Sequence, residues 1–160
     1  MSTAHRPEIR TLANLEAAFA GESMAHIKYR YFAKLAREAG DEETARTFEA
    51  TADQEVMHAF GHLDLLYPRH SMTPARALQI AIAGETYEYS EMYPGFRATA
   101  EAEGNAAAVA EINEQIAESR EHAAQFKATL EKAQKRFAAL ARVEERHARH
   151  YQAQLDRVNA

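Results

Sequence analysis

The sequence predicts an all-α protein, a four-helix bundle with an extended C-terminal helical segment. Three observations predict this class. Apolar residues recur at three- and four-residue steps almost throughout, which is the period of one helix face. Glycine and proline are scarce, with 6 and 4 residues in 160, and no segment alternates with the two-residue period of a strand. A glutamate followed by a Glu-x-x-His motif occurs twice, and four helices are the simplest scaffold that directs two such sets inward.

The first two helices are expected after an N-terminal tail of residues 1–10. Helical periodicity predicts one helix over residues 11–39 and a second over residues 42–66. Gly40 ends the first helix, because glycine readily adopts the left-handed conformation of a helix C-terminus. The carboxylate of Asp41 is suited to cap the second helix.

The third helix is expected over residues 75–103, after a linker of residues 67–74. Thr73 is suited to cap it, and Pro74 fits its first turn. Pro94 then lies inside the helix, where proline removes one backbone hydrogen bond and clashes with the preceding turn.

The internal repeat explains how Pro94 is tolerated. The equivalent residues Glu22 and Glu85 are 63 positions apart. The glycines that follow them, Gly40 and Gly104, are 64 positions apart. One residue is therefore inserted near Pro94, and a single inserted residue predicts a π-bulge, a feature that favours functional sites.

The last helical segment, residues 106–158, is longer than the repeat requires. Its Glu-x-x-His motif begins at Glu144, 89 residues after Glu55, so 25 residues are inserted relative to the offset of 64. That length is about seven whole helical turns, so the apolar face returns to the same phase. The apolar period of about 3.5 residues from Val109 to Leu140 is typical of coiled coils. We expect either one long helix or two extended helices that form a protruding hairpin.

The composition limits the classes of function. A length of 160 residues suits a single domain. The formal net charge of −5 argues against nucleic acid as a partner, because no basic surplus can neutralise phosphates. The absence of cysteine excludes disulfides, zinc ribbons, iron–sulfur clusters and thiol catalysis. No secretory signal and no membrane-spanning apolar run is visible, so we expect a cytoplasmic protein without a membrane partner.

Carboxylates and histidines at helical spacing form the candidate site. Each Glu-x-x-His pair projects from one helix face, because its members are three residues apart. Glu22 lies 33 residues before Glu55, with the predicted turn near the midpoint, so an antiparallel hairpin places the two carboxylates level. Carboxylates and imidazoles without thiolates suit iron or manganese. The spacing predicts two metal ions held by Glu22, Glu55, His58, Glu85, Glu144 and His147.

A structural role is the alternative to a metal site. An isolated Glu-x-x-His pair on a helix is usually a solvated surface pair. Glu55, however, lies on the apolar stripe of Ala52 and Ala59, where an ionised group costs several kcal/mol unless it is paired or bound to a metal. Tyr29 and Tyr93 are either hydrogen-bonding groups around the metals or ordinary core tyrosines.

These motifs resemble the diiron domain of the rubrerythrins, within the ferritin-like superfamily. The resemblance rests on Ala20-Gly21-Glu22-Ser23, on Glu55-x-x-His58 and on the segment from Ala81 to Pro94. It covers residues 11–104 closely and residues 135–157 again. It implies a ferritin-like bundle whose two carboxylate-bridged iron ions reduce hydrogen peroxide, one iron shifting between a glutamate and a histidine. Manganese or zinc can substitute. The implied ligands are Glu22, Glu55, His58, Glu85, Glu88, Glu144 and His147.

Two features depart from the family pattern. Typical rubrerythrins carry a rubredoxin domain with four cysteines, and this sequence has none, so we expect an external electron donor such as a rubredoxin-like protein or a reductase. The 25-residue insertion also holds a second candidate for the last ligands, namely Glu118 and Glu121 or His122. Ser119 stands three residues before His122, where the motif needs glutamate. We prefer Glu144 with His147.

The length of the last segment bears on the assembly. If it is one helix, Glu144 lies about 33–40 Å beyond the level of Glu85 and can complete a site only in a partner chain. We therefore expect a homodimer that is domain-swapped or otherwise intertwined. Two other functions stay open. One is iron handling, as a ferroxidase or a storage protein, and the other is a metal-free helical module that binds another helix.

Overall fold

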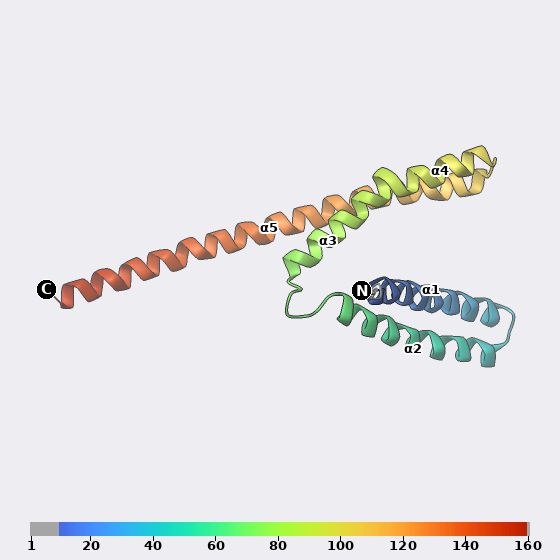
Figure 1. Cartoon of the computed structure of the whole chain (residues 1–160), viewed down its shortest axis with the longest axis horizontal. Helices are drawn as coiled ribbons and strands as arrows, with labels where there is room; N and C mark the ends of the chain where they lie inside the picture. The colour runs from blue at the N-terminus through green and yellow to red at the C-terminus, as the bar shows by residue number, and fades with distance from the viewer. Residues whose placement is uncertain (1–9, 160) are drawn as a thin grey trace, which may run out of the picture. The chain divides into compact units, whose positions relative to one another are not determined.

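The structure, a computed structural model, describes residues 10–159. These residues form helices and connecting turns without any strand, which confirms the predicted all-α class (Figure 1). The chain divides into two compact units, Met1–Met72 and Thr73–Ala160, and each is described by itself. Apart from Arg10, the predicted N-terminal tail lies outside the described residues. The elements are α1 (Thr11–Glu38), α2 (Glu42–Leu66), α3 (Pro74–Tyr87), the π-helical turn η1 (Glu88–Met92), α4 (Tyr93–Ala102) and α5 (Ala106–Val158).

The first unit is an antiparallel hairpin of α1 and α2. Gly40 has a φ of +83°, the left-handed conformation that ends α1, and the Asp41 carboxylate accepts a hydrogen bond from the Thr44 backbone N–H at 3.0 Å. The two helices approach closely because small side chains line their contact. The buried residues of this seam are Ala33, Ala45, Ala52 and Ala59.

Polar contacts set the register of the hairpin. His26 Nδ1 lies 2.8 Å from the Ala52 carbonyl oxygen, and because a carbonyl only accepts, the imidazole donates this bond. Arg37 in the last turn of α1 bonds to both Glu42 and Glu49 of α2. With His26 opposite Ala52, the residue one turn before His26 is level with the residue one turn after Ala52.

The second unit begins with a helix that is widened in its middle. Thr73 accepts a hydrogen bond from the Arg76 N–H, and Pro74 occupies the first turn, as the sequence predicts. The predicted inserted residue is confirmed as the π-helical turn η1, in which the Tyr93 N–H bonds to the Glu88 carbonyl five residues earlier. A π turn holds one residue more than an α turn. Pro94 is the second residue of α4, next to the π turn, where the α-helical bonding pattern is already interrupted.

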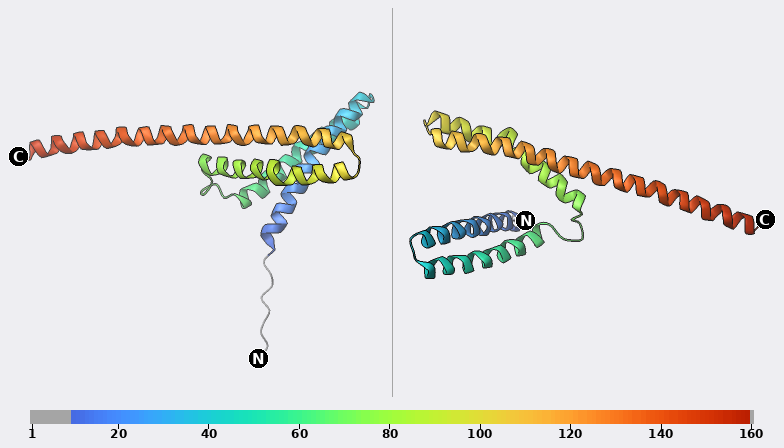
Figure 2. Two further views of the ribbon diagram at one scale, coloured as in Figure 1. Left: turned by 90° about the horizontal axis from the view of Figure 1, so that it is seen from above. Right: turned by 180° about the vertical axis from the view of Figure 1, so that it is seen from behind.

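The last segment is one continuous helix, the first of the two expected alternatives. After Gly104, which has a φ of +71°, the side chain of Asn105 caps α5 by accepting from the Ala108 N–H at 3.1 Å. The 53-residue helix returns antiparallel along α4, η1 and α3 and then runs past the start of α3 (Figure 2). None of the helices in residues 10–159 is long and apolar enough to cross a membrane.

Candidate metal centre

The hairpin of the first unit carries one group of potential metal ligands. One ligand atom from each of Glu22, Glu55 and His58 lies within 4.8 Å of the others. Glu22 comes from α1, and the other two project from the same face of α2. The register set by His26 and Ala52 explains why the two carboxylates are level.

The charges in this group favour a cation. His58 Nδ1 lies 2.9 Å from Glu55 Oε2, and since an ionised carboxylate only accepts, the imidazole holds the proton between them. Glu22 adds a second carboxylate to the same small volume. A bound divalent cation would replace the shared proton and offset the repulsion of the two carboxylates.

The second unit brings together a second group, from α3, η1 and α5. Glu85 Oε2 lies 3.5 Å from His122 Nδ1, and Ser119 Oγ donates a hydrogen bond of 3.0 Å to Glu88 Oε2. The two contacts share one register. Glu85 and Glu88 are three residues apart along α3 and η1, and Ser119 and His122 are three residues apart along the antiparallel α5. Ser119 is 4% exposed, so it is a buried polar side chain whose position is set by packing.

The environment of the Glu85 carboxylate indicates whether a metal ion fits between these side chains. Its Oε2 atom is buried and has no hydrogen-bond partner, because 3.5 Å to His122 is an ion-pair distance and too long for a good hydrogen bond. A buried carboxylate oxygen without a partner is costly. Carboxylate and imidazole donors suit iron or manganese, so a cation between Glu85 and His122 fits these residues.

Tyr93 lies in the electric field of the same carboxylates. Burial raises the pKa of its phenol, and the nearby charges of Glu88, Glu85, Glu111 and Glu118 raise this pKa further. The hydroxyl therefore keeps its proton and can donate it in a hydrogen bond. The same four carboxylates make this part of the unit attractive to a cation.

The remaining predicted residues lie elsewhere. Glu144 and His147 contact each other at 3.5 Å on α5, and their side chains are exposed. Tyr29 belongs to an aromatic cluster in the first unit, with its ring centroid 5.8 Å from that of Phe48. The roles of these three residues at a metal site stay predictions.

Three residues make contacts in the structure that the sequence does not predict, namely Ser119, His122 and His26. It gives His122 only as an alternative ligand, because Ser119 stands where the Glu-x-x-His pattern needs glutamate. The distance of each residue from the Gly104 turn could have shown this. Ser119 and His122 follow the turn by about as many residues as Glu88 and Glu85 precede it. His26 is missed, although its position one turn after Glu22 puts it on the same helix face.

Helices that bring glutamates and histidines together in this way define an all-α protein with a candidate metal site of carboxylate and imidazole donors. The sequence model described as Rubrerythrin matches residues 13–130. This match covers more than half of the chain, and the chain belongs to the rubrerythrin family. The predicted ferritin-like fold class is confirmed with it.

The chain is similar to several characterised relatives. It is 42% identical to nigerythrin from Nitratidesulfovibrio vulgaris, over 62% of this chain and 55% of that protein. It is 40% identical to rubrerythrin from the same organism, over 59% and 56%, and 38% identical to rubrerythrin from Porphyromonas gingivalis, over 59% and 53%. The chain thus spans about half the length of these relatives. A solved structure of fully reduced, all-ferrous nigerythrin aligns with a TM-score of 0.40 at 35% identity, over 84% of this chain and 73% of that one.

Proposed function

We propose that this chain is the metal-binding part of a non-haem diiron oxidoreductase that reduces hydrogen peroxide to water. The observation that carries the proposal is the buried Oε2 of Glu85, which accepts no hydrogen bond and lies 3.5 Å from His122 Nδ1, in a chain whose first unit holds another group of Glu and His. Membership of the rubrerythrin family supports iron as the metal and peroxide as the substrate.

Each unit contributes donors for iron. In the first unit the ligands are Glu22, Glu55 and His58. In the second unit they are the carboxylates of Glu85 and Glu88 and the imidazole of His122. We favour His122 over the distal pair of Glu144 and His147, because His122 is the histidine that lies beside Glu85.

Residues around the ligands have separate tasks. Ser119 holds Glu88 in place through its hydrogen bond. Tyr93, which keeps its proton, is a hydroxyl donor next to Glu88 and Glu85. When bound, two ferrous ions supply the two electrons that the O–O bond requires. The electrons reach the site from a donor outside these 160 residues, because no cysteine is present to hold an iron–sulfur or rubredoxin-type centre.

The test combines metal analysis with anaerobic reoxidation. Purified protein loaded with ferrous iron should retain two iron ions per chain, and the reduced protein should be reoxidised much faster by hydrogen peroxide than by dioxygen. Sustained turnover should require an added reductase and electron carrier. Faster reaction with dioxygen and uptake of many iron ions per chain would instead identify an iron-handling protein. Purified protein that binds no metal would leave only the helical interaction module.

A further inference from the structure

The distal part of α5 has no partner within its own unit. Glu85 lies opposite His122 and Glu88 opposite Ser119, so each step back along α3 corresponds to a step forward along α5. Pro74, the first residue of α3, is therefore level with about Ala133. Among the described residues of this unit, none lies alongside α5 beyond that level (Figure 2). Residues 133–158 are called the distal segment below.

The distal segment continues the apolar stripe by which α5 packs on α3. The buried Ala123 belongs to the packed part of this stripe, and the same three- and four-residue steps lead on to exposed apolar side chains. Relative exposures are 71% for Phe137, 54% for Leu140 and 69% for Tyr151. A helix of this length gains little stability from propensity alone and normally depends on packing of its apolar face.

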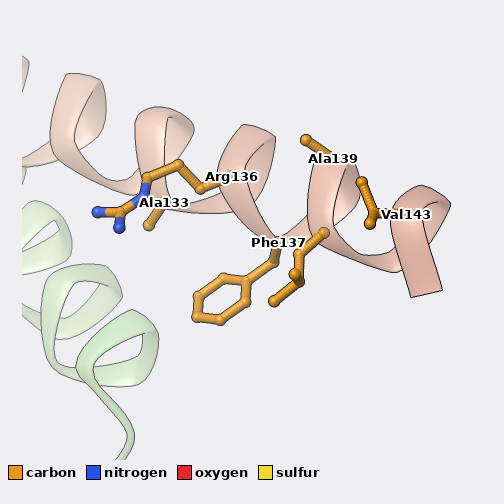
Figure 3. Close-up of a pocket in the computed structure, with 6 residues that line it drawn as sticks. Ala133, Arg136, Phe137, Ala139 and Val143 are labelled. Atoms are coloured by element: carbon orange, nitrogen blue, oxygen red, sulfur yellow. The ribbon is translucent and has the colours of Figure 1, made fainter.

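A concavity on the distal segment has one wall only. It is lined by Ala133, Arg136, Phe137, Ala139, Leu140 and Val143, all from α5 (Figure 3). The side chains of Phe137 and Ala133 project toward the same side in this view, the side on which α3 begins. No other element of this unit, among the described residues, supplies a second wall. Because the stripe is continuous with the α3–α5 interface, a helix that takes the place along α5 that α3 leaves at Pro74 would supply it.

We propose that the distal segment pairs antiparallel with the distal segment of a second copy of this chain. The midpoint of residues 133–158 falls between Glu144 and His147. With a two-fold axis at this point, the partner's distal segment lies along the whole exposed stripe. Ala133 then faces the partner's Val158, and Leu140 faces the partner's Tyr151. An isologous contact of this kind is self-complementary.

The charges of the stripe select this orientation. In the antiparallel pair Glu144 faces the partner's His147, and His147 faces the partner's Glu144, so each carboxylate meets an imidazole. In a parallel pair Glu144 would face the same carboxylate of the partner inside the seam, which is unfavourable. A parallel pair would also place α3 of both copies between the two α5 helices, and packed helices need an axial distance of only about 8–10 Å. In the same antiparallel register Arg136 is level with the partner's Leu155.

Cross-linking tests the orientation directly, since the chain has no cysteine of its own. Single variants Leu140→Cys and Tyr151→Cys are refolded together and mildly oxidised. The mixture should give a disulfide-linked dimer of one chain of each kind, while each variant alone should give at least tenfold less. Linked dimers of Leu140→Cys alone would show a parallel seam and overturn the proposal. Absence of linked dimer in the mixture would overturn it as well.

Sedimentation tests the seam independently. Wild-type protein at micromolar concentration should have the mass of a dimer. The double variant Leu140→Asp/Tyr151→Asp should have the mass of a monomer. The matched control, Arg142→Asp with Arg149→Asp on the opposite helix face, should stay dimeric. An unchanged mass of the seam variant, or a monomeric wild type, would refute the seam. Loss of iron from a dimeric His147→Gln variant would assign this histidine to the iron site and equally refute it.

Discussion

Ser119→Ala tests whether a metal ion binds beside Glu88. The Ser119 hydroxyl is buried and donates a 3.0 Å hydrogen bond to the Glu88 carboxylate. A hydrogen bond to a charged group contributes about 1.5–3 kcal/mol. Alanine regains about 0.5 kcal/mol of helix propensity relative to serine. In metal-free protein the variant should therefore lower the free energy of unfolding by about 1–2.5 kcal/mol.

The metal-loaded protein should respond less to the same change. A cation bound to Glu88 holds the carboxylate and offsets its charge, so the loss should fall below about 1 kcal/mol. The assay is urea unfolding followed by circular dichroism, once with chelator and once with ferrous iron under anaerobic conditions. Protein concentration is kept equal, because dimerisation contributes to the apparent stability.

Thr129→Ala is the matched control for this experiment. Thr129 is on the same helix and exposed, and its hydroxyl bonds only to the Gln125 carbonyl of α5. Its replacement should change the free energy of unfolding by less than about 0.5 kcal/mol, equally with and without iron. Two results would refute the reasoning about Ser119. One is an equal loss in the metal-free and metal-loaded protein, and the other is no loss without metal.

Further predictions concern the first unit. The Glu55→Ala variant should lose most of its iron, as measured by elemental analysis. The control variant Asp53→Ala, which removes only the exposed partner of Arg30, should keep its iron. A Glu55→Ala variant that retains two irons per chain would exclude Glu55 as a ligand. Arg37→Ala should make the α1–α2 hairpin less sensitive to acid. The hydrogen bond from Arg37 lowers the pKa of Glu49, so its stabilisation is present above the ordinary pKa of about 4.5 and disappears as pH falls through the lower folded-state value. Melting temperatures at pH 7 and pH 3.5 measure this, and an unchanged difference between the two pH values in the variant would contradict it.

Several elements could be predicted from residues close together in the chain. Asp41 and Thr73 cap the helices that follow them, and Gly40 and Gly104 adopt positive φ, because caps and turns depend on a few neighbouring residues. The π turn before Pro94 followed from comparing two offsets in the repeat, since one extra residue has few ways to fit in a helix.

The contacts between helices were harder to predict. The bond from His26 to the Ala52 carbonyl joins residues 26 positions apart, and nothing in the local pattern distinguishes it from an exposed histidine. The bond from Ser119 to Glu88 spans 31 positions and pairs residue types that are common on helix surfaces. Such contacts depend on the register between helices, which many side chains set together.

The sequence by itself determined the helices, their caps, the π turn and the helix faces that carry glutamate and histidine. These features depend on interactions within one or two helical turns. Only the tertiary structure decided which histidine of α5 lies beside Glu85. His122 and His147 are 25 residues apart, about seven whole turns, so both lie on the same face and periodicity cannot separate them. The packing of α5 against α3 sets the position along the helix axis, and it brings His122 to Glu85.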